Sequence, residues 1–581
     1  MLTKIIVLCI ALGISLIQGN TLEGVVLDSK NSKPISSANI QIKDTALGTS
    51  SDENGRFSID IDNIGSFELN ISVIGYKDTT ALIESEQLIG ITEFYLNQTA
   101  IEFDELDVHS HYHNKISKSP SSISIFGNKF QKSTKNSLAS TLAGESGLAV
   151  RSFGQATERP ILRGYSGDRF LIARDGTELN DLSATSADHA VSTEISSMDG
   201  VEIIRGPESL LYGSNTIAGV INLSPLLSNQ TLVEKPVYKL ILGHESSNKS
   251  NVAYFGTIIP KGSYQFSSSV SAREADNQLS PIGEVKNTAL SKSDIFTSLA
   301  KYNDNGYSIL SLENFEMSYG IPSSPEGHID GVDLKMKKTS QKFKYHADIN
   351  LGKYNTLDVE QGHVNYEHRE FENNKSYHAV LLSHVINYFK VDISSDIFKI
   401  GGLYQRKKFI AGGFYWTPNT YEDKLAIYAS KKGVIFGYDT DYSGRIEHRS
   451  IRPRPGETFF SNLDANEVRN RQFTLVSGGV SFFKEREYLS NYYQILFTSR
   501  APSIEDLYSD GPHLGNYAYE IGDPNLKQEN TLGFENTLSM FNSKSSLDFT
   551  SYLNYSPNYH ISTKMGDGYF PGAEWVEWGS G

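Results

Sequence analysis

The chain has 581 residues and a formal net charge of −15 at pH 7, the wrong sign for a general nucleic-acid binder. Its one cysteine, Cys9, lies in the apolar stretch Ile5–Ile17, so we exclude a disulfide scaffold, a CxxC redox site and a thiolate zinc site. That stretch is shorter than the ~20 residues of a membrane-spanning helix, which excludes a polytopic helical protein. The 32 Tyr, 29 Phe and 48 Gly are typical of a β-rich protein.

Residues 1–19 have the pattern of a secretory signal peptide. Lys4 supplies the positive region, Ile5–Ile17 forms the apolar core, and the small residues Gly19 and Asn20 follow. We therefore expect the protein to be exported.

Residues 20–98 are expected to form a small β-sandwich. Short alternating runs recur every 10–15 residues between turn signals, without helical periodicity. The stretch Thr49–Phe57, followed by Val73–Tyr76, resembles the carboxypeptidase-regulatory-like domain. The chain contains no HExxH motif and no cysteine nucleophile outside the leader, so we expect a structural or interaction module rather than a hydrolase.

Residues 99–119 form the expected linker. Ile101–Val108 alternates acidic and apolar side chains, a pattern that suits either a strand added to a partner's sheet edge or an ordinary linker strand. His109, His111 and His113 follow at period two and would point the same way in an extended chain. They suit a metal ion, but a solvated linker is the favoured interpretation, because flexible segments rarely pre-organise a site.

The sequence pattern changes over residues 120–228. Ser137–Ala143 is expected to form a short helix that ends at Gly144, and short apolar strands then end in tight glycine turns with arginines at the strand ends. Arginines with buried stems form ion pairs that hold a compact domain inside a polar lumen. The recurrent turn blocks are Arg163-Gly164, Asp175-Gly176 and Arg205-Gly206-Pro207.

Together with the run Ile204–Asn222, in which Ala218 replaces a glycine, these blocks resemble the plug domain of TonB-dependent outer-membrane receptors. The resemblance implies a protein of the bacterial outer membrane, in contact with its lipid, that is not an enzyme and has no cofactor or catalytic residue of its own. It implies coupling to the TonB complex (TonB, ExbB and ExbD) on the periplasmic side. The coupling segment, or TonB box, would then comprise Glu105, Leu106, Asp107 and Val108.

Residues 229–581 are expected to form a transmembrane antiparallel β-barrel around an α+β plug. In Tyr264–Arg273, apolar and polar side chains alternate, which is the pattern of a barrel strand with an apolar outer face and a polar inner face. Plugged transporters have 22 strands, whereas this segment has room for about 14–17. We therefore expect an incomplete barrel and a C-terminally truncated chain.

Several blocks indicate a metal cargo. Asp188-His189 lies within the plug, and His368, Glu370 and Glu372 share one face of a barrel strand. Imidazole and carboxylate ligands without cysteine suit Zn²⁺ or a similar divalent ion. The blocks are similar to the branch of TonB-dependent receptors that includes zinc-uptake receptors, and this resemblance implies the following metal-site residues: Asp188, His189, Glu326, His328 and His513.

The sequence leaves the cargo open. The loop that carries Glu326 and His328 has one histidine where the zinc branch has a cluster, and the Asp-His pair and His513 would also suit turn caps or buried polar networks. The leading function is import of zinc or a metal complex. The alternative is a receptor for a ferric siderophore or another organic chelate. A surface adhesin and a cell-surface hydrolase fit less well, because an adhesin needs no plug and the sequence shows no hydrolase motif.

Overall fold

The computed structural model describes most of the chain from residue 20 onward. The described residues are 20–97 and 122–580, apart from gaps at 44, 46, 62–65, 74–75, 77, 84–90, 187, 228–229, 324–330, 373–375, 414–416, 455–462, 464–465, 514–517, 543 and 568–573. The signal peptide and the proposed coupling segment therefore lie outside the described residues.

The N-terminal domain contains two small sheets that pack on each other. One has the order β4-β1-β7 and the other β3-β2-β5-β6. The strands are β1 (Asn20–Asp28), β2 (Asn39–Ile42), β3 (Gly48–Ser50), β4 (Arg56–Ile61), β5 (Phe67–Ser72), β6 (Thr79–Ile83) and β7 (Ile91–Leu96). Alternation along each strand buries one face, and Leu22, Ile40, Phe57, Leu69 and Phe94 belong to the resulting core. The expected small β-domain is confirmed.

The plug domain is built on a five-stranded sheet with the order β12-β11-β14-β13-β8, beside the hairpin β9-β10. Its strands are β8 (Ile123–Phe126), β9 (Leu148–Arg151), β10 (Arg159–Leu162), β11 (Leu171–Arg174), β12 (Thr177–Glu178), β13 (Met198–Ile204) and β14 (Val220–Pro225). Its helical turns are α2 (Gly127–Ser133), α3 (Leu138–Leu142), η2 (Gly167–Arg169), η3 (Ile195–Ser197) and η4 (Pro207–Leu211). Helix α3 confirms the helix expected there, whereas α2 was not foreseen.

Ser137 caps the N-terminus of α3. Its side chain accepts from the Ser140 backbone N–H, and the Ser140 side chain accepts from the Ser137 backbone N–H, which together form a capping box. Gly206, between β13 and η4, has a φ of 80°, in the region that favours glycine. A Cβ atom there would lie 2.3 Å from Oε1 of Gln494 in the surrounding sheet. The Arg205-Gly206-Pro207 block therefore marks a close approach between plug and sheet.

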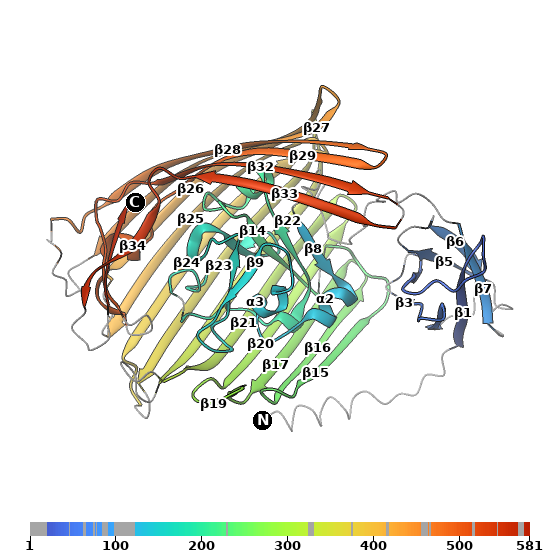
Figure 1. Cartoon of the computed structure of the whole chain (residues 1–581), viewed down its shortest axis with the longest axis horizontal. Helices are drawn as coiled ribbons and strands as arrows, with labels where there is room; N and C mark the ends of the chain where they lie inside the picture. Colours follow the sequence, from blue (N-terminus) through green and yellow to red (C-terminus); the bar gives the residue numbers. More distant parts are fainter. Residues whose placement is uncertain are drawn as a thin grey trace. The chain divides into compact units, whose positions relative to one another are not determined.

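A 15-stranded antiparallel sheet curves around the plug (Figure 1). Each strand pairs with the strand that follows it in the sheet order, and among the described strands β15 and β33 are the two edges. The strands are β15 (Val237–Glu245), β16 (Ser250–Lys261), β17 (Tyr264–Ala275), β20 (Leu290–Asn303), β21 (Gly306–Ile321), β22 (Val332–Leu351), β23 (Tyr354–Glu372), β24 (Val380–Ser394), β25 (Phe398–Gly413), β26 (Asn419–Ile435), β27 (Tyr438–Arg454), β28 (Arg471–Arg486), β29 (Leu489–Arg500), β32 (Glu529–Phe541) and β33 (Ser546–Tyr555).

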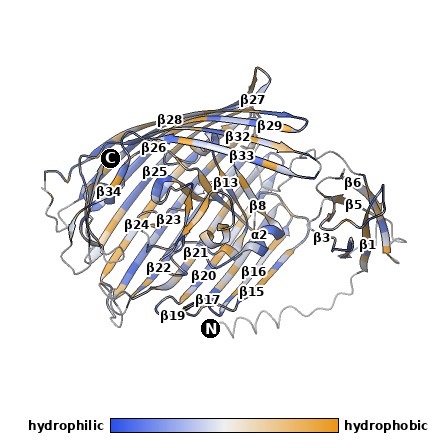
Figure 2. Cartoon of the chain, in the orientation of Figure 1, coloured by the Kyte–Doolittle hydropathy of each residue, from blue (hydrophilic) through white to orange (hydrophobic). Residues whose placement is uncertain are grey.

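The two faces of this sheet differ in polarity. In β17, Tyr264 and Phe266 are exposed on the outer face, whereas Gln265, Ser267 and Arg273 are buried on the inner face. Figure 2 shows the same alternation of hydrophobic and hydrophilic residues along the neighbouring strands. The apolar-out, polar-in pattern expected for a membrane barrel is thus confirmed in the fold.

The two ends of the sheet differ in loop length. One end carries the short turns 262–263, 304–305, 352–353, 395–397, 436–437, 487–488 and 542–545. The other end carries the longer connections 276–289, 322–331, 373–379, 414–418, 455–470 and 501–528, together with the short 246–249. In outer-membrane barrels the short turns are periplasmic and the longer loops extracellular.

Small elements occupy the connections at the long-loop end and the end of the chain. These are β18 (Gln278–Ser280), β19 (Gly283–Val285), α4 (Ile504–Tyr508), β30 (Asp510–His513), β31 (Ala518–Ile521), β34 (His560–Asp567) and β35 (Glu574–Ser580). Strands β30, β31, β35 and β34 form a separate sheet in that order. In the part of the chain that the structure describes, no helix is long and apolar enough to cross a membrane.

Arginines of the plug hold it to the inner face of the sheet. Both Nη atoms of Arg163 donate to the Glu535 carboxylate, at 2.6 and 2.9 Å. Arg169 donates to both oxygens of Glu529 at 3.1 and 3.0 Å. Such two-pronged contacts fix orientation as well as charge, because the planar guanidinium matches the carboxylate.

A third buried ion pair runs from sheet to plug. Arg273 of β17 donates to the carboxylate of Glu194, with its shortest contact at 3.0 Å, and both side chains are at most 2% exposed. Burial alone would raise the pKa of Glu194, but the charges of Arg273 and Lys292 and the hydrogen bonds from Arg273 outweigh it and lower the pKa to about 2.

We predict that Glu194→Gln lowers the free energy of unfolding by about 3–5 kcal/mol, because it leaves the Arg273 guanidinium buried without a counter-charge. Thermal unfolding, monitored by near-ultraviolet circular dichroism, measures this change. Glu274→Gln is the matched control, since Glu274 is the next residue of β17 and is exposed. Equal destabilisation by both variants would contradict the prediction.

The same pair predicts a pH dependence. The pKa of Glu194 is lower in the folded protein than in the unfolded chain. Its contribution to stability is therefore complete above about pH 4.5 and is lost as the pH falls towards 2. We expect the difference in stability between the native protein and Glu194→Gln to shrink over that range. A difference that stays constant down to pH 2 would rule out this role for the carboxylate.

Candidate metal site

The inner face of β23 carries a row of polar and aromatic side chains near the long-loop end. Strand alternation puts Tyr366, His368 and Glu370 on this face. The register with β24 pairs Tyr366 with His384 and His368 with Leu382. His368 is fully buried, so the hydrogen-bond partners of its ring must come from neighbours inside the lumen.

A loop of the plug, described for residues 180–186 and 188–192, faces this row. Asp181 organises the loop: Oδ1 accepts from the backbone N–H and the hydroxyl of Ser183, and Oδ2 accepts from the same two groups of Ser192. The Tyr319 hydroxyl of β21 donates to the carbonyl oxygen of Asp188 at 3.2 Å and accepts from the backbone N–H of Ala190. Asp188 and His189 are thereby held in a buried turn, each less than 5% exposed.

His189 from the plug meets His368 and Glu370 from the barrel wall. Oε1 of Glu370 lies 3.7 Å from Nε2 of His189 and 3.3 Å from Nε2 of His368. The two imidazole rings lie with their centroids 4.5 Å apart. One donor atom from each of the three residues lies within 4.8 Å of the others. We call these three residues the HHE cluster.

Hydrogen bonding fixes which nitrogen of His189 faces the cluster. Its Nδ1 lies 3.1 Å from the carbonyl oxygen of Leu182 and 3.1 Å from the Thr185 hydroxyl. Because a carbonyl can only accept, the neutral ring carries its proton on Nδ1 and keeps the lone pair of Nε2. Metal-binding histidines have this arrangement, in which one nitrogen donates to a backbone carbonyl and the other binds the ion.

The HHE cluster has the chemistry of a site for a divalent ion. Donor-to-metal distances near ~2.1 Å in a tetrahedral zinc site put neighbouring donors about 3.4 Å apart. The donors of His368 and His189 lie 3.3 and 3.7 Å from Oε1 of Glu370, the first in a hydrogen bond to the carboxylate, and all three donors lie within 4.8 Å of one another. Two imidazoles and one carboxylate, without thiolate, suit zinc among the common ions. Three protein ligands also leave a fourth position for water or for a group that accompanies the ion.

The structure places the sequence-predicted site residues as follows. His189 is in the HHE cluster, and Asp188 precedes it in the same buried turn, where its carboxylate accepts from the Ser186 hydroxyl. Glu326 and His328 lie outside the described residues, as does the side chain of His513, whose backbone belongs to β30. Alternation along β23 had indicated that His368 and Glu370 share a face, but sequence reasoning did not assign them to the site.

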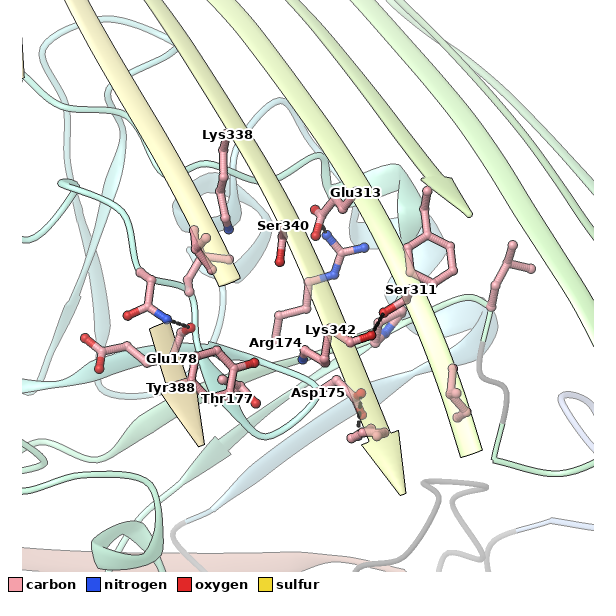
Figure 3. A pocket seen from close by; sticks show the side chains of 18 of the residues that line it. Arg174, Asp175, Thr177, Glu178, Ser311, Glu313, Lys338, Ser340, Lys342 and Tyr388 are labelled. Atoms are coloured by element: carbon pink, nitrogen blue, oxygen red, sulfur yellow. Dashed lines mark hydrogen bonds and ion pairs between the residues drawn. The ribbon is translucent and has the colours of Figure 1, made fainter. Parts of the chain in front are cut away.

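A cavity of about 110 Å³, lined by apolar and charged side chains, lies between the plug and the inner face of β20–β24. Figure 3 shows Arg174 of the plug pointing at Glu313, with which it forms an ion pair. Asp175, in the predicted Asp175-Gly176 block, lies 2.7 Å from Nζ of Lys344. These charges pair with each other, so this cavity is part of the contact between plug and sheet.

Comparison with protein families identifies two domains. The TonB-dependent Receptor Plug Domain model matches residues 115–220, and the CarboxypepD_reg-like domain model matches residues 22–108. The chain is 26% identical over 153 residues to the vitamin B12 transporter BtuB of Vibrio vulnificus strain YJ016, a match that covers 26% of this chain and 24% of the relative. BtuB of strain CMCP6 is 31% identical over 91 residues, which cover 16% of this chain and 14% of the relative. The matched part thus spans a quarter or less of these relatives.

Solved structures share the fold over most of the chain. The copper transporter OprC superimposes with a TM-score of 0.65 at 14% identity, covering 80% of this chain and 75% of that one. The Serratia marcescens hemophore receptor HasR has a TM-score of 0.62 at 11% identity, with coverage of 79% and 77%. The siderophore receptor PirA of Pseudomonas aeruginosa has a TM-score of 0.57 at 14% identity, with coverage of 80% of each chain. Plug and sheet therefore have the fold of TonB-dependent receptors, and these relatives are transporters and receptors, not enzymes.

We predict that His368→Ala raises the dissociation constant for zinc on the order of 100-fold or more. Mutating a hydrogen-bond partner of a metal ligand typically lowers metal affinity 10- to 100-fold, and loss of the ligand itself should cost more. Calorimetry with zinc on the intact receptor measures this. His363→Ala is the control, since His363 lies on the same strand on the opposite face. Equal zinc affinity in the His368→Ala and native proteins would contradict the site.

Proposed function

We propose that this chain is a TonB-dependent outer-membrane receptor that imports a divalent metal ion, zinc being the ion that its donor set favours. One observation carries the proposal: two imidazoles and a carboxylate converge where the plug meets the barrel wall. The long loops lie at the same end of the sheet as this cluster, since Glu370 is two residues before the end of β23. The site therefore suits capture of an ion that arrives from outside.

The division of ligands between two bodies suggests how binding and release are coupled. His189 belongs to the plug, whereas His368 and Glu370 belong to β23. A plug movement that withdraws His189 removes one of three ligands, so the ion is held less tightly once the plug is displaced. A conformational change can drive release only by such a difference in affinity between two states.

Metal binding requires that the imidazole nitrogens and the carboxylate of the HHE cluster carry lone pairs. The Leu182 carbonyl keeps the His189 proton on Nδ1 and leaves Nε2 ready for the ion. The Tyr366 hydroxyl lies 3.5 Å from Nδ1 of His368 and is placed to orient that ring. Both histidines thus have an outer partner on the nitrogen that faces away from Glu370.

Energy for the plug movement would come from the TonB complex. The proposed coupling segment comprises Glu105, Leu106, Asp107 and Val108, which lie directly before the plug and outside the described residues. An alternating segment of this kind can add as a strand to a partner's sheet, where backbone hydrogen bonds provide the affinity.

The test of coupling is Leu106→Pro. Proline removes a backbone donor and bends an added strand, so we expect uptake of radioactive zinc by cells to fall to the level of cells without the receptor. Zinc binding to the purified receptor should remain unchanged, because the HHE cluster is not altered. Leu106→Val, which keeps the backbone N–H, is the control. Undiminished uptake by Leu106→Pro would exclude this segment as the coupling strand.

The test of the cargo is uptake by cells that carry His189→Ala. Loss of zinc uptake, with a normal amount of receptor in the outer membrane, is the expected result. If His189→Ala abolishes neither zinc binding nor zinc uptake, metal-ion import is wrong. Import of an iron siderophore or another organic chelate then becomes the function to test.

A further inference from the structure

Four cationic side chains gather on the outer face of the large sheet, near the long-loop ends of neighbouring strands. Arg406 and Lys408 lie on β25, and Arg452 and Arg454 lie on β27. Strand alternation turns all four away from the lumen, where Arg406, Lys408 and Arg454 are exposed and Arg452 is half-buried. We call these four side chains the outer basic patch.

One carboxylate serves two of these cations. Asp423 lies on β26, the strand between β25 and β27, and is opposite Arg406 in the register. Its Oδ1 accepts from Nε of Arg406 at 2.7 Å, and its Oδ2 forms an ion pair with Arg452. Two positive charges therefore share one negative charge.

The other two cations have an aromatic ring as their neighbour. Tyr421 of β26 is opposite Lys408, whose Nζ lies 6.0 Å from the centroid of the ring. Cζ of Arg454 lies 5.8 Å from the same centroid. Such a contact attracts a cation without neutralising its charge. Among the described residues, neither Lys408 nor Arg454 has a carboxylate within 4.0 Å, so four positive charges against one negative charge leave a net charge of +3 here.

Two other cations on the outer face show the usual compensation. Nζ of Lys337 on β22 lies 2.8 Å from a carboxylate oxygen of Glu316, and Nε of Arg369 on β23 lies 2.8 Å from one of Glu367. Like charges on neighbouring strands destabilise a sheet unless something compensates them. In the outer basic patch, the described part of the chain supplies only one of the negative charges required. A negatively charged partner would supply the others.

The position of the outer basic patch along the strands indicates what kind of partner this is. Further from the long loops, the same face carries exposed apolar side chains, namely Tyr404, Leu425, Ile427 and Ile446. Strands rise about 3.3 Å per residue, so Leu425 lies only about 7 Å along β26 from Asp423. In an outer-membrane barrel the apolar band faces the acyl chains and the long loops are extracellular. The patch therefore lies at the level of the head groups of the outer leaflet.

From this arrangement we infer that the outer basic patch binds the phosphate groups of a lipid in the outer leaflet. Clusters of lysine and arginine at a membrane surface attract anionic lipids. Arginine matches phosphate with two parallel N–H donors, and lysine binds it as a point charge. A free phosphate ion would contact only the charges, whereas a phosphorylated lipid contacts the charges with its head group and the apolar side chains with its acyl chains. This site does not depend on the cargo of the receptor.

The test is native mass spectrometry of lipid binding to the intact receptor in nonionic detergent. The probes are diphosphorylated lipid A, the same lipid without its phosphates, and inorganic phosphate. The double variant Lys408→Gln, Arg454→Gln removes the two cations that have no carboxylate. We expect it to weaken binding of diphosphorylated lipid A on the order of 10- to 100-fold, the factor expected for hydrogen bonds to a charged group. The lipid without phosphates should bind more weakly, and equally to the native and variant receptors.

Two further variants separate charge from structural damage. The double variant Lys337→Gln, Arg369→Gln is the matched control, because these cations lie on the same face and have carboxylates of their own, and it should leave lipid binding unchanged. Asp423→Asn removes the one negative charge of the outer basic patch and should strengthen binding, whereas mere damage to the strands would weaken it. A native near-ultraviolet circular dichroism spectrum shows that each variant is folded.

Three results would overturn the lipid site. The first is diphosphorylated lipid A that binds the Lys408→Gln, Arg454→Gln variant as tightly as the native receptor. The second is equal affinity of the native receptor for lipid A with and without phosphates, which would exclude recognition of the phosphates. The third is inorganic phosphate that binds as tightly as the lipid, which would exclude a lipid as the specific occupant. After any of these results, an acidic protein surface would be the partner to test.

Discussion

Every charge that enters the lumen needs a partner there, and this requirement holds the plug in place. The outer face of the sheet is apolar, so polar side chains concentrate on the inner face, where they are shielded from bulk water. Arg163 and Arg169 of the plug form ion pairs with glutamates of the sheet, and Arg273 of the sheet forms one with Glu194 of the plug. Removing either member of such a pair leaves a buried charge, so plug and sheet specify each other.

Among the contacts between plug and sheet, one group of side chains has the chemistry to hold a metal ion. In the HHE cluster, two imidazoles and a carboxylate are brought together by ligands from both plug and sheet. Two imidazoles and a carboxylate in one buried place suit a divalent ion, and under the proposed function that ion is the cargo.

Much of the fold could be predicted from the sequence because it depends on local patterns. Alternation of the kind seen from Tyr264 onward gives the strands and their faces, and the glycine-arginine blocks mark where plug strands end close to the sheet. The space available predicted about 14–17 barrel strands, and the large sheet has 15. Helix α2 was not predicted, because its seven residues include Gly127 and Ser133 and its N-cap, Phe126, provides no side-chain capping hydrogen bond.

The site was predictable only in part. His189 stood out through the Asp-His pair, and the pattern of β23 indicated that His368 and Glu370 share a face. Their meeting depends on how the plug docks against the strand, a long-range contact that no local pattern encodes. The partner of each plug arginine is harder still to foresee, since it depends on which acceptors the fold brings close. Arg163 and Arg169 reach glutamates of the sheet, whereas Arg159 donates to the Ser186 carbonyl oxygen within the plug.

The most direct test of the account is X-ray absorption at the zinc edge, on the intact receptor loaded with one equivalent of zinc. The account predicts a first shell of two imidazole nitrogens near ~2.0–2.1 Å, completed by oxygen, with the outer-ring scattering that imidazole produces. In His189→Ala one of the two imidazoles should disappear. A first shell of oxygen alone, the same in the native protein and in His189→Ala, would contradict the claim that the HHE cluster binds the metal.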